Sequence, residues 1–163
     1  PAGPAEYPAV LLAGLPDVWQ AAFIPTPALD PHGLYAAIAL EFGLSDAGGD
    51  EALLHRLQRH FIELAQMNRQ PVLLIDEAQA LPVETLEAVR LLTNLETEKR
   101  KLLQVVLFGQ PELMDRLREK RTRQILTRIS FHAALRPLGP QECGAYVRHR
   151  LGVAGATRTV FSS

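Results

Sequence analysis

The sequence has 163 residues, 47% of them hydrophobic and 21% charged, with 17 lysines and arginines against 18 aspartates and glutamates. This balance is typical of one soluble globular domain, which at this size buries a core without disulfides or structural metals. The single cysteine, Cys143, excludes a scaffold of intrachain disulfides. The formal net charge of −1 gives no global field that would attract nucleic acid or anionic lipid. No apolar run approaches the roughly 20 residues that span a bilayer, so we expect no membrane contact from this chain.

The chain is expected to open with a loop, a short helix and a strand. Residues 1–8 hold three prolines and a glycine, which excludes a regular helix or a central strand there. The apolar run 9–15 fits a strand or a helix equally well, and we favour the helix. Residues 18–24 are rich in aromatic and β-branched side chains and stop at Pro25, which predicts a strand.

Helical signals dominate the next stretch. Asp30 is a suitable N-cap for a helix that begins at Pro31 and ends at Gly43. A second helix is expected after Asp50, because the apolar residues that follow recur at spacings of three and four. Similar signals predict further helices over residues 81–94, 111–119, 122–127 and 140–151.

Two mostly apolar runs, at residues 72–75 and 102–108, predict strands over 72–76 and 102–108 that are buried on both faces, as inside a parallel sheet. Residues 129–135 alternate between apolar and polar side chains, which predicts one more strand. Strands that alternate with helices indicate an α/β fold with a mainly parallel sheet and helices on both of its faces.

The most informative segment is the end of the first of these runs, where Asp76 and Glu77 follow four aliphatic residues. Open α/β sheets bind ligands at the carboxyl ends of their strands. An acidic pair at this place is the Walker B element of P-loop NTPases, in which the first carboxylate orients Mg²⁺ and the second polarises the attacking water. The alternative is that the pair only ends the strand and caps the next helix.

Three more residues are candidates for a nucleotide site. Gln110 follows the next predicted strand, where such ATPases place an amide that senses the γ-phosphate; the alternative is a turn residue before Pro111. Arg128 and, as second choice, Arg123 precede the predicted strand at 129–135. An arginine in that position can reach the γ-phosphate bound by an adjacent subunit as an arginine finger. For each arginine the alternative is a solvent-exposed cationic helix.

The order and spacing of these motifs resemble the AAA+ ATPase domain of the ExeA family, which comprises general secretion pathway protein A and the MSHA biogenesis ATPases. The resemblance runs from about residue 9 to the end and rests on LLIDEAQAL at 73–81, VRLLTNLE at 89–96, VVLFGQPEL at 105–113 and LTRI at 126–129.

The resemblance implies a P-loop NTPase-like fold and hydrolysis of ATP with Mg²⁺ held by Asp76. It also implies assembly as a homo-oligomer or with a related ATPase subunit, and contact with the proteins of a bacterial type II secretion or type IV (MSHA-like) pilus system. The implied location is the cytoplasm, at the inner face of the inner membrane in the full-length protein.

The chain departs from this family at the phosphate-binding loop, which has the form G-x-x-x-x-G-K-[ST]. The sequence contains no Gly-Lys pair, and residues 1–8 occupy the matching place with prolines and Glu6. Amide donors and a lysine would be needed there to hold phosphates. We therefore expect residues 9–163 to be a partial AAA+ core, incomplete at both ends, without the lid subdomain and inactive alone as an ATPase.

Two other functions remain open at this point. If residues 1–8 replace the loop in the natural protein, the domain is a degenerate ATPase that acts as a nucleotide-independent interaction module. If the basic residues between 116 and 128 bind duplex DNA, it is a regulator like the transposition ATPases, which share the acidic pair. That basic segment is otherwise a subunit interface or a solvated face.

Overall fold

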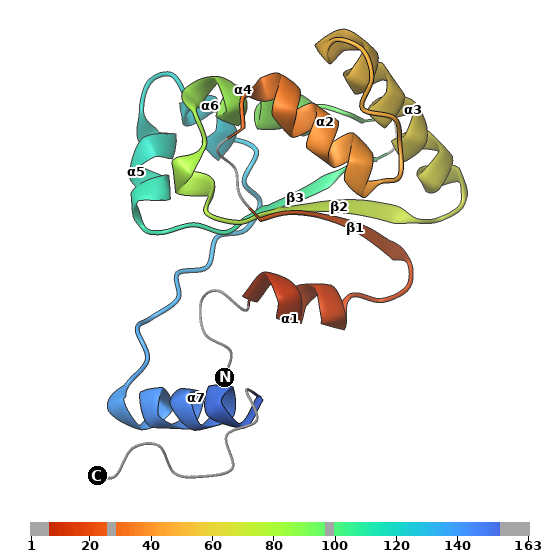
Figure 1. The fold of residues 1–163 in the computed structure, drawn as a ribbon. Coiled ribbons are helices and arrows are strands. Elements are labelled where there is room, and N and C mark those ends of the chain that lie inside the picture. Colours follow the sequence, from red (N-terminus) through yellow and green to blue (C-terminus); the bar gives the residue numbers. More distant parts are fainter. Residues whose placement is uncertain (1–6, 26–28, 97–99, 154–163) are drawn as a thin grey trace.

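The computed structural model describes residues 7–25, 29–96 and 100–153. Its strands are β1 (Trp19–Ile24), β2 (Gln70–Ile75) and β3 (Gln104–Leu107). Its helices are α1 (Tyr7–Gly14), α2 (Pro31–Glu41), α3 (Asp50–Gln66), the 3₁₀ helix η2 (Ala78–Ala80), α4 (Val83–Leu92), α5 (Glu112–Arg118), α6 (Arg123–Leu126) and α7 (Pro140–Val153) (Figure 1). None of the described helices is long and apolar enough to cross a bilayer.

The strands form one parallel sheet in the order β1-β2-β3. Trp19 lies opposite Gln70 and Ile24 lies opposite Ile75, which in turn lies opposite Leu107 on β3. This register ends the strands at the same edge of the sheet. The loops that follow β2 and β3 are therefore neighbours.

Most elements predicted from apolar runs and capping residues are present. The three strands correspond to the predictions at 18–24, 72–76 and 102–108, and each predicted helix has a counterpart. The predicted burial of the third strand on both faces is wrong, because β3 lies at the edge of the described sheet and is only partly buried. The Asp30 side chain caps α2 by accepting the N–H of Gly33 at 2.8 Å. The predicted parallel α/β fold is confirmed. Of the loop predicted at residues 1–8, residues 1–6 lie outside the described part of the chain. The prediction is wrong for residues 7 and 8, because α1 begins at Tyr7 and a proline is tolerated in the first turn of a helix.

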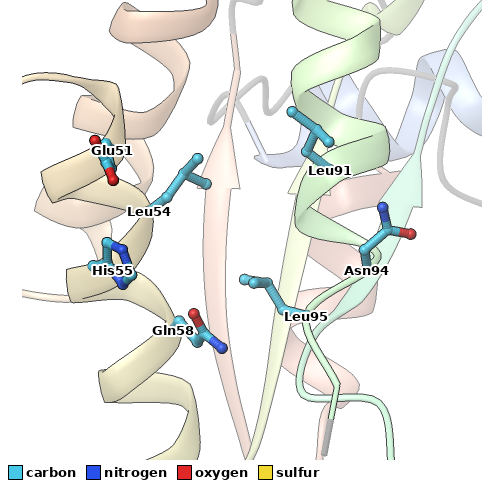
Figure 2. A pocket seen from close by; sticks show the side chains of 7 residues that line it. All are labelled: Glu51, Leu54, His55, Gln58, Leu91, Asn94 and Leu95. Atoms are coloured by element: carbon cyan, nitrogen blue, oxygen red, sulfur yellow. The ribbon is translucent and has the colours of Figure 1, made fainter.

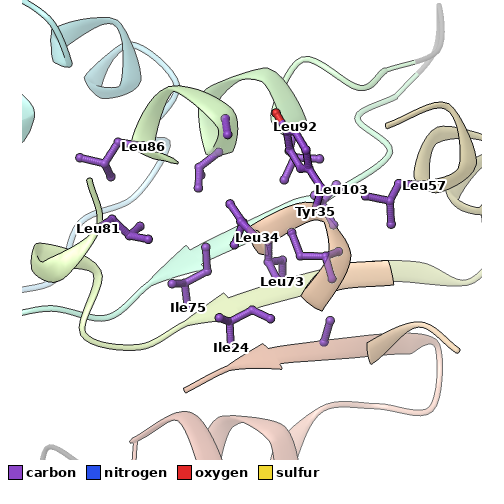
Figure 3. Packing of buried hydrophobic residues seen from close by; sticks show 14 of the residues in the cluster. Ile24, Leu34, Tyr35, Leu57, Leu73, Ile75, Leu81, Leu86, Leu92 and Leu103 are labelled. Carbon is purple, nitrogen blue, oxygen red and sulfur yellow. The ribbon is translucent and has the colours of Figure 1, made fainter. Parts of the chain in front are cut away.

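The core lies between one face of the sheet and the helices α2, α3 and α4 (Figure 1). Ile24 and Leu73 of the sheet belong to the same cluster of buried side chains as Leu86 of α4 (Figure 3). Val72 and Leu74 of β2 are also buried, and α1 lies on their side of the sheet (Figure 1). Because β2 is covered on both faces, its sequence is continuously apolar and not alternating.

The prediction of a strand at residues 129–135 is wrong. Residues 129–139 form neither helix nor strand and run as an extended segment to α7 (Figure 1). Phe131 and Leu135 in this segment are exposed, with 83% and 62% of their surface accessible, whereas Ile129 at its start is partly buried against the core. A strand takes its hydrogen bonds from a neighbouring strand, and within the described residues no strand pairs with this segment. The alternating pattern alone does not bring it into the sheet.

Phe61 provides a test of the core. Its side chain is fully buried on α3, and its ring is edge-on to Phe42 with a centroid distance of 5.1 Å. Truncation removes apolar contacts and leaves a cavity, so we expect Phe61→Ala to lower the free energy of unfolding by about 3–5 kcal/mol in urea titrations. Gln66→Ala, at an exposed position of the same helix, is the control and is expected to change it by less than about 0.5 kcal/mol. Equal effects of the two substitutions would contradict the described packing.

Candidate nucleotide site

Two loops meet at the edge where the strands end. Asp76 and Glu77 follow β2, and the loop that contains Gln110 follows β3. The N–H of Ala78 in the first loop donates to the carbonyl of Phe108 in the second, at 2.8 Å. The structure therefore brings the predicted acidic pair and the predicted sensor residue to one edge of a parallel sheet, where such sheets bind ligands.

Asp76 is held at the end of the central strand. Its N–H donates to the carbonyl of Ile24 on β1 at 3.0 Å, which extends the β1–β2 pairing by one residue. Its Oδ1 accepts the N–H of Glu77 at 2.9 Å, and the side chain is half-buried. The position of this carboxylate is thus fixed by the sheet on one side and by the turn on the other.

The donor set at this edge suits Mg²⁺ only together with a phosphate ligand. Among the described residues, no group of three or more His, Cys, Asp or Glu side chains is placed to hold a metal ion. Mg²⁺ usually binds one or two carboxylates together with waters and substrate phosphates. Asp76 fits that arrangement, in which the chain supplies one carboxylate and a nucleotide supplies other oxygens.

Glu77 forms a sharp turn between β2 and η2. Its backbone is left-handed, with φ 50° and ψ 35°, a conformation that residues with a side chain rarely adopt. Its side chain is exposed and makes no capping hydrogen bond to η2. Because α4 begins only at Val83, with Pro82 at its N-cap position, the acidic pair does not cap that helix either.

Gln79 connects the two loops through its side chain. Its Oε1 accepts the backbone N–H of Gln110 at 3.1 Å, and its Nε2 donates to Glu77 Oε2 at 2.5 Å. Its backbone carbonyl accepts a hydrogen bond from the guanidinium of Arg116 on α5. Gln79 could not be recognised from the sequence, because Gln110, which it contacts, lies 31 positions away and follows a different strand.

Gly109 allows the close approach of the two loops. A β-carbon at this position would lie 3.0 Å from Gln79 Oε1 and 2.9 Å from Leu113 Cδ2, so a larger residue would displace these two side chains. The side chain of the neighbouring Gln110 is exposed, and only its backbone takes part in the contact with Gln79. Its role as a γ-phosphate sensor stays a prediction.

Among the ion pairs of the described residues, neither candidate arginine finger is paired with Glu77. Arg123 begins α6, Arg128 follows it, and both side chains are exposed. The hydrogen bond from Lys101 lowers the pKa of Glu96, and the charge of Arg128 lowers it further, which places Arg128 near this pair. Glu96 and Lys101 precede β3, at the opposite end of the strands from Glu77. Since a finger acts on the nucleotide of a neighbouring subunit, both roles stay predictions.

A groove of about 410 Å³ lies between α3 and the end of α4 (Figure 2). Leucines from both segments line it together with polar side chains: Glu51, Leu54, His55, Gln58, Leu91, Asn94 and Leu95. A smaller one of about 250 Å³ lies beside Val83 and Arg121. Neither contains Asp76 or Glu77, so the candidate site is defined by the two loops and not by these grooves.

The similarity of this chain to known proteins agrees with the geometry. The model of a family described as AAA domain matches residues 11–117. General secretion pathway protein A of Aeromonas hydrophila is 44% identical over 155 residues, which are 93% of this chain and 28% of that relative. The resemblance predicted from the sequence motifs is confirmed. The chain spans less than a third of the length of this relative.

The fold is also similar to that of a solved protein. Two structures of the Aeropyrum pernix ORC2 protein, one of ADPNP-ADP complexes and one of the ADP form, match with TM-scores of 0.66 and 0.64. Each match covers 90% of this chain and 39% of the ORC2 chain, at 16% and 14% sequence identity. At this level of identity the likeness shows the fold alone.

Proposed function

Because this chain belongs to the family of AAA domains, we propose that it is the catalytic part of an ATPase whose site lies at the two loops after β2 and β3. In this proposal Asp76 holds Mg²⁺ together with the nucleotide phosphates, and Glu77 polarises the attacking water. Gln110 senses the γ-phosphate. Arg128, or in second place Arg123, reaches the nucleotide of a neighbouring subunit.

The observation that carries this proposal is the contact between the two loops. Hydrolysis of a nucleotide needs a carboxylate for the metal, a group that orients water and a group that detects the terminal phosphate, all held in fixed relative positions. Asp76, Glu77 and Gln110 are the groups of these types, and Gln79 bonds to two of them. A solvated strand end would not need this connection.

We propose that the activity drives assembly or operation of a bacterial type II secretion system or a type IV, MSHA-like pilus. The support is the 44% identity to a protein called General secretion pathway protein A. The domain would act as a homo-oligomer or with a related ATPase subunit, in the cytoplasm at the inner face of the inner membrane, in contact with proteins of that machine.

Because the sequence lacks a phosphate-binding loop, we can predict how weakly this chain binds ATP. The sequence has no Gly-Lys pair, and the amides and lysine of a phosphate-binding loop normally cradle and neutralise the phosphates. We therefore expect the 163-residue chain to bind Mg·ATP too weakly for detection by calorimetry at micromolar concentrations. Micromolar affinity would contradict the proposed division of roles between the loop and the acidic pair.

The matched experiment uses what we call the loop-bearing chain, in which the upstream strand and a G-x-x-x-x-G-K-[ST] loop precede residue 9. It is expected to bind and hydrolyse ATP, and the same chain with alanine in place of the loop lysine is expected to do neither. A loop-bearing chain that binds ATP without hydrolysing it would contradict the ATPase proposal. It would favour a degenerate interaction module instead.

The basic side chains of α6 and of the turn that precedes it favour one other function, binding of duplex DNA by a regulator of the transposition type. Lys120, Arg121 and Arg123 are exposed, although Arg121 also pairs with Glu84 at 3.3 Å. Lysine and arginine contacts to DNA phosphates weaken steeply with salt. Retention on duplex DNA that falls with salt, and that is reduced by Lys120→Ala, would favour this function over a subunit interface.

A further inference from the structure

We propose that Gln79 is a positioning residue that fixes the carboxylate of Glu77 and couples it to the loop after β3. The proposal rests on the proposed ATPase function, because it concerns how Glu77 is presented to the attacking water. Gln79 itself touches no phosphate in this proposal. It acts through Glu77 on one side and through the Gln110 backbone on the other.

The backbone of Gln110 decides how the Gln79 amide is turned. A backbone N–H only donates, so the Gln79 atom that faces it at 3.1 Å must be the oxygen, Oε1. The nitrogen, Nε2, then lies on the other side of the amide, where Glu77 Oε2 is 2.5 Å away. A carboxylate only accepts, so one orientation of the amide makes both bonds and the flipped orientation makes neither.

Hydrogen bonds of the backbone at residues 78 and 79 fix the point from which the Gln79 side chain starts. Arg116 donates to the Gln79 carbonyl, and the preceding residue, Ala78, donates to Phe108 at 2.8 Å. The absence of a β-carbon at Gly109 leaves room for Oε1, to which such a carbon would be 3.0 Å away. A side chain with a fixed backbone and a half-buried position loses less conformational freedom when it is oriented than an exposed one.

The consequence for Glu77 follows from its exposure. Within the described residues, the bond from Gln79 is the one that holds this exposed carboxylate. A shift of the Gln110 backbone changes the position of the Gln79 amide and therefore that of Glu77. Contact between Gln110 and a terminal phosphate would in this way be transmitted to the group that orients water.

The first test is amide hydrogen exchange, followed by NMR on the 163-residue chain. Gln79→Met keeps the length of the side chain and removes both bonds, and we expect it to speed exchange of the Gln110 N–H about fivefold, the effect of one net hydrogen bond. Gln79→Glu keeps an acceptor for Gln110 but replaces the donor to Glu77 with a second carboxylate. It is expected to leave Gln110 exchange within about twofold of the wild-type rate.

Two controls accompany this measurement. The Ala78 N–H, which bonds to Phe108 and not to Gln79, is expected to exchange at the wild-type rate in both variants. Gln124→Met removes an exposed glutamine on α6 and is expected to leave Gln110 unchanged. Wild-type exchange at Gln110 in Gln79→Met overturns the proposal. If the Ala78 N–H also exchanges faster in Gln79→Met, the turn itself has opened in that variant. The effect of Gln79→Glu on turnover then decides whether Gln79 has the proposed role.

The second test separates this proposal from the proposed function. In the loop-bearing chain, Gln79→Glu is expected to lower kcat about tenfold or more and to change KM for ATP less than about twofold, because the interaction concerns the reacting water and not ATP binding. If the loop-bearing chain hydrolyses ATP and both Gln79 variants keep its kcat, the positioning role is overturned and the ATPase function stands. If the unsubstituted chain does not hydrolyse ATP, the ATPase function fails while the exchange result at Gln110 still decides the coupling.

Discussion

Glu77→Gln in the loop-bearing chain is expected to slow ATP hydrolysis about a hundredfold or more while ATP binding is unchanged, since general acid–base catalysis contributes roughly 10²–10⁴ in rate. The substitution keeps the shape of the side chain and an oxygen that accepts from Gln79. It removes the negative charge that polarises water. Steady-state turnover and calorimetric ATP affinity, measured on the same preparation, separate the two effects.

Two further substitutions make this result specific. Asp76→Asn is expected to weaken the Mg²⁺-dependent part of ATP binding, because the neutral amide is a poorer ligand for a hard cation. Glu84→Gln, at an exposed glutamate of α4 that pairs with Arg121, is expected to leave both turnover and binding unchanged. Full turnover by Glu77→Gln would remove Glu77 from the proposed mechanism, whatever the other two variants do.

Arg128→Ala is expected to reduce turnover of the loop-bearing chain by roughly 10³-fold or more, the range in which arginine fingers operate. Because the finger reaches the nucleotide of a neighbour, the loss can be complemented. Mixing Arg128→Ala with Glu77→Gln pairs an intact Arg128 with an intact Glu77 at some subunit contacts. We expect the mixture to hydrolyse ATP faster than either variant alone, as measured by turnover at fixed total protein.

The control for this experiment is Arg118→Ala. Arg118 is also exposed and pairs with Asp115 at 3.1 Å, so its loss tests the effect of one surface charge on α5. If Arg128→Ala behaves like Arg118→Ala, the same mixing experiment with Arg123→Ala tests the second candidate. Wild-type turnover in both Arg128→Ala and Arg123→Ala would show that neither arginine takes part in hydrolysis.

The strands of the sheet could be predicted from the sequence because a strand that is buried consists largely of apolar residues. Val72 to Ile75 are all apolar since β2 is buried on both faces, and the acidic pair marks where the strand leaves the core. The capping signal at Asp30 was also local, as the donor it accepts from is three residues away. The run 9–15 was ambiguous because seven apolar residues fit either element, and α1 shows that the helix is formed.

The remaining features depend on partners that a single segment does not reveal. The alternation at 129–135 contains no information about whether a neighbouring strand is present to pair with it. The contact between Gln79 and Gln110 exists only because the parallel register places the ends of β2 and β3 side by side. For the same reason the steric role of Gly109 is visible only in the folded chain.

At Glu77 the conformation that the backbone adopts lowers the stability of the fold, while the side chain is proposed to be needed for ATP hydrolysis. Among the described residues, Asn68 and Glu77 are the non-glycine residues with positive φ, and asparagine tolerates this conformation better than glutamate does. Holding a glutamate there costs on the order of 1 kcal/mol or more, which glycine would recover. Variants selected for thermal stability alone are therefore expected to carry a substitution at Glu77. A stabilised domain obtained in that way would lose the carboxylate on which hydrolysis is proposed to depend, so engineering for heat resistance has to exempt this position.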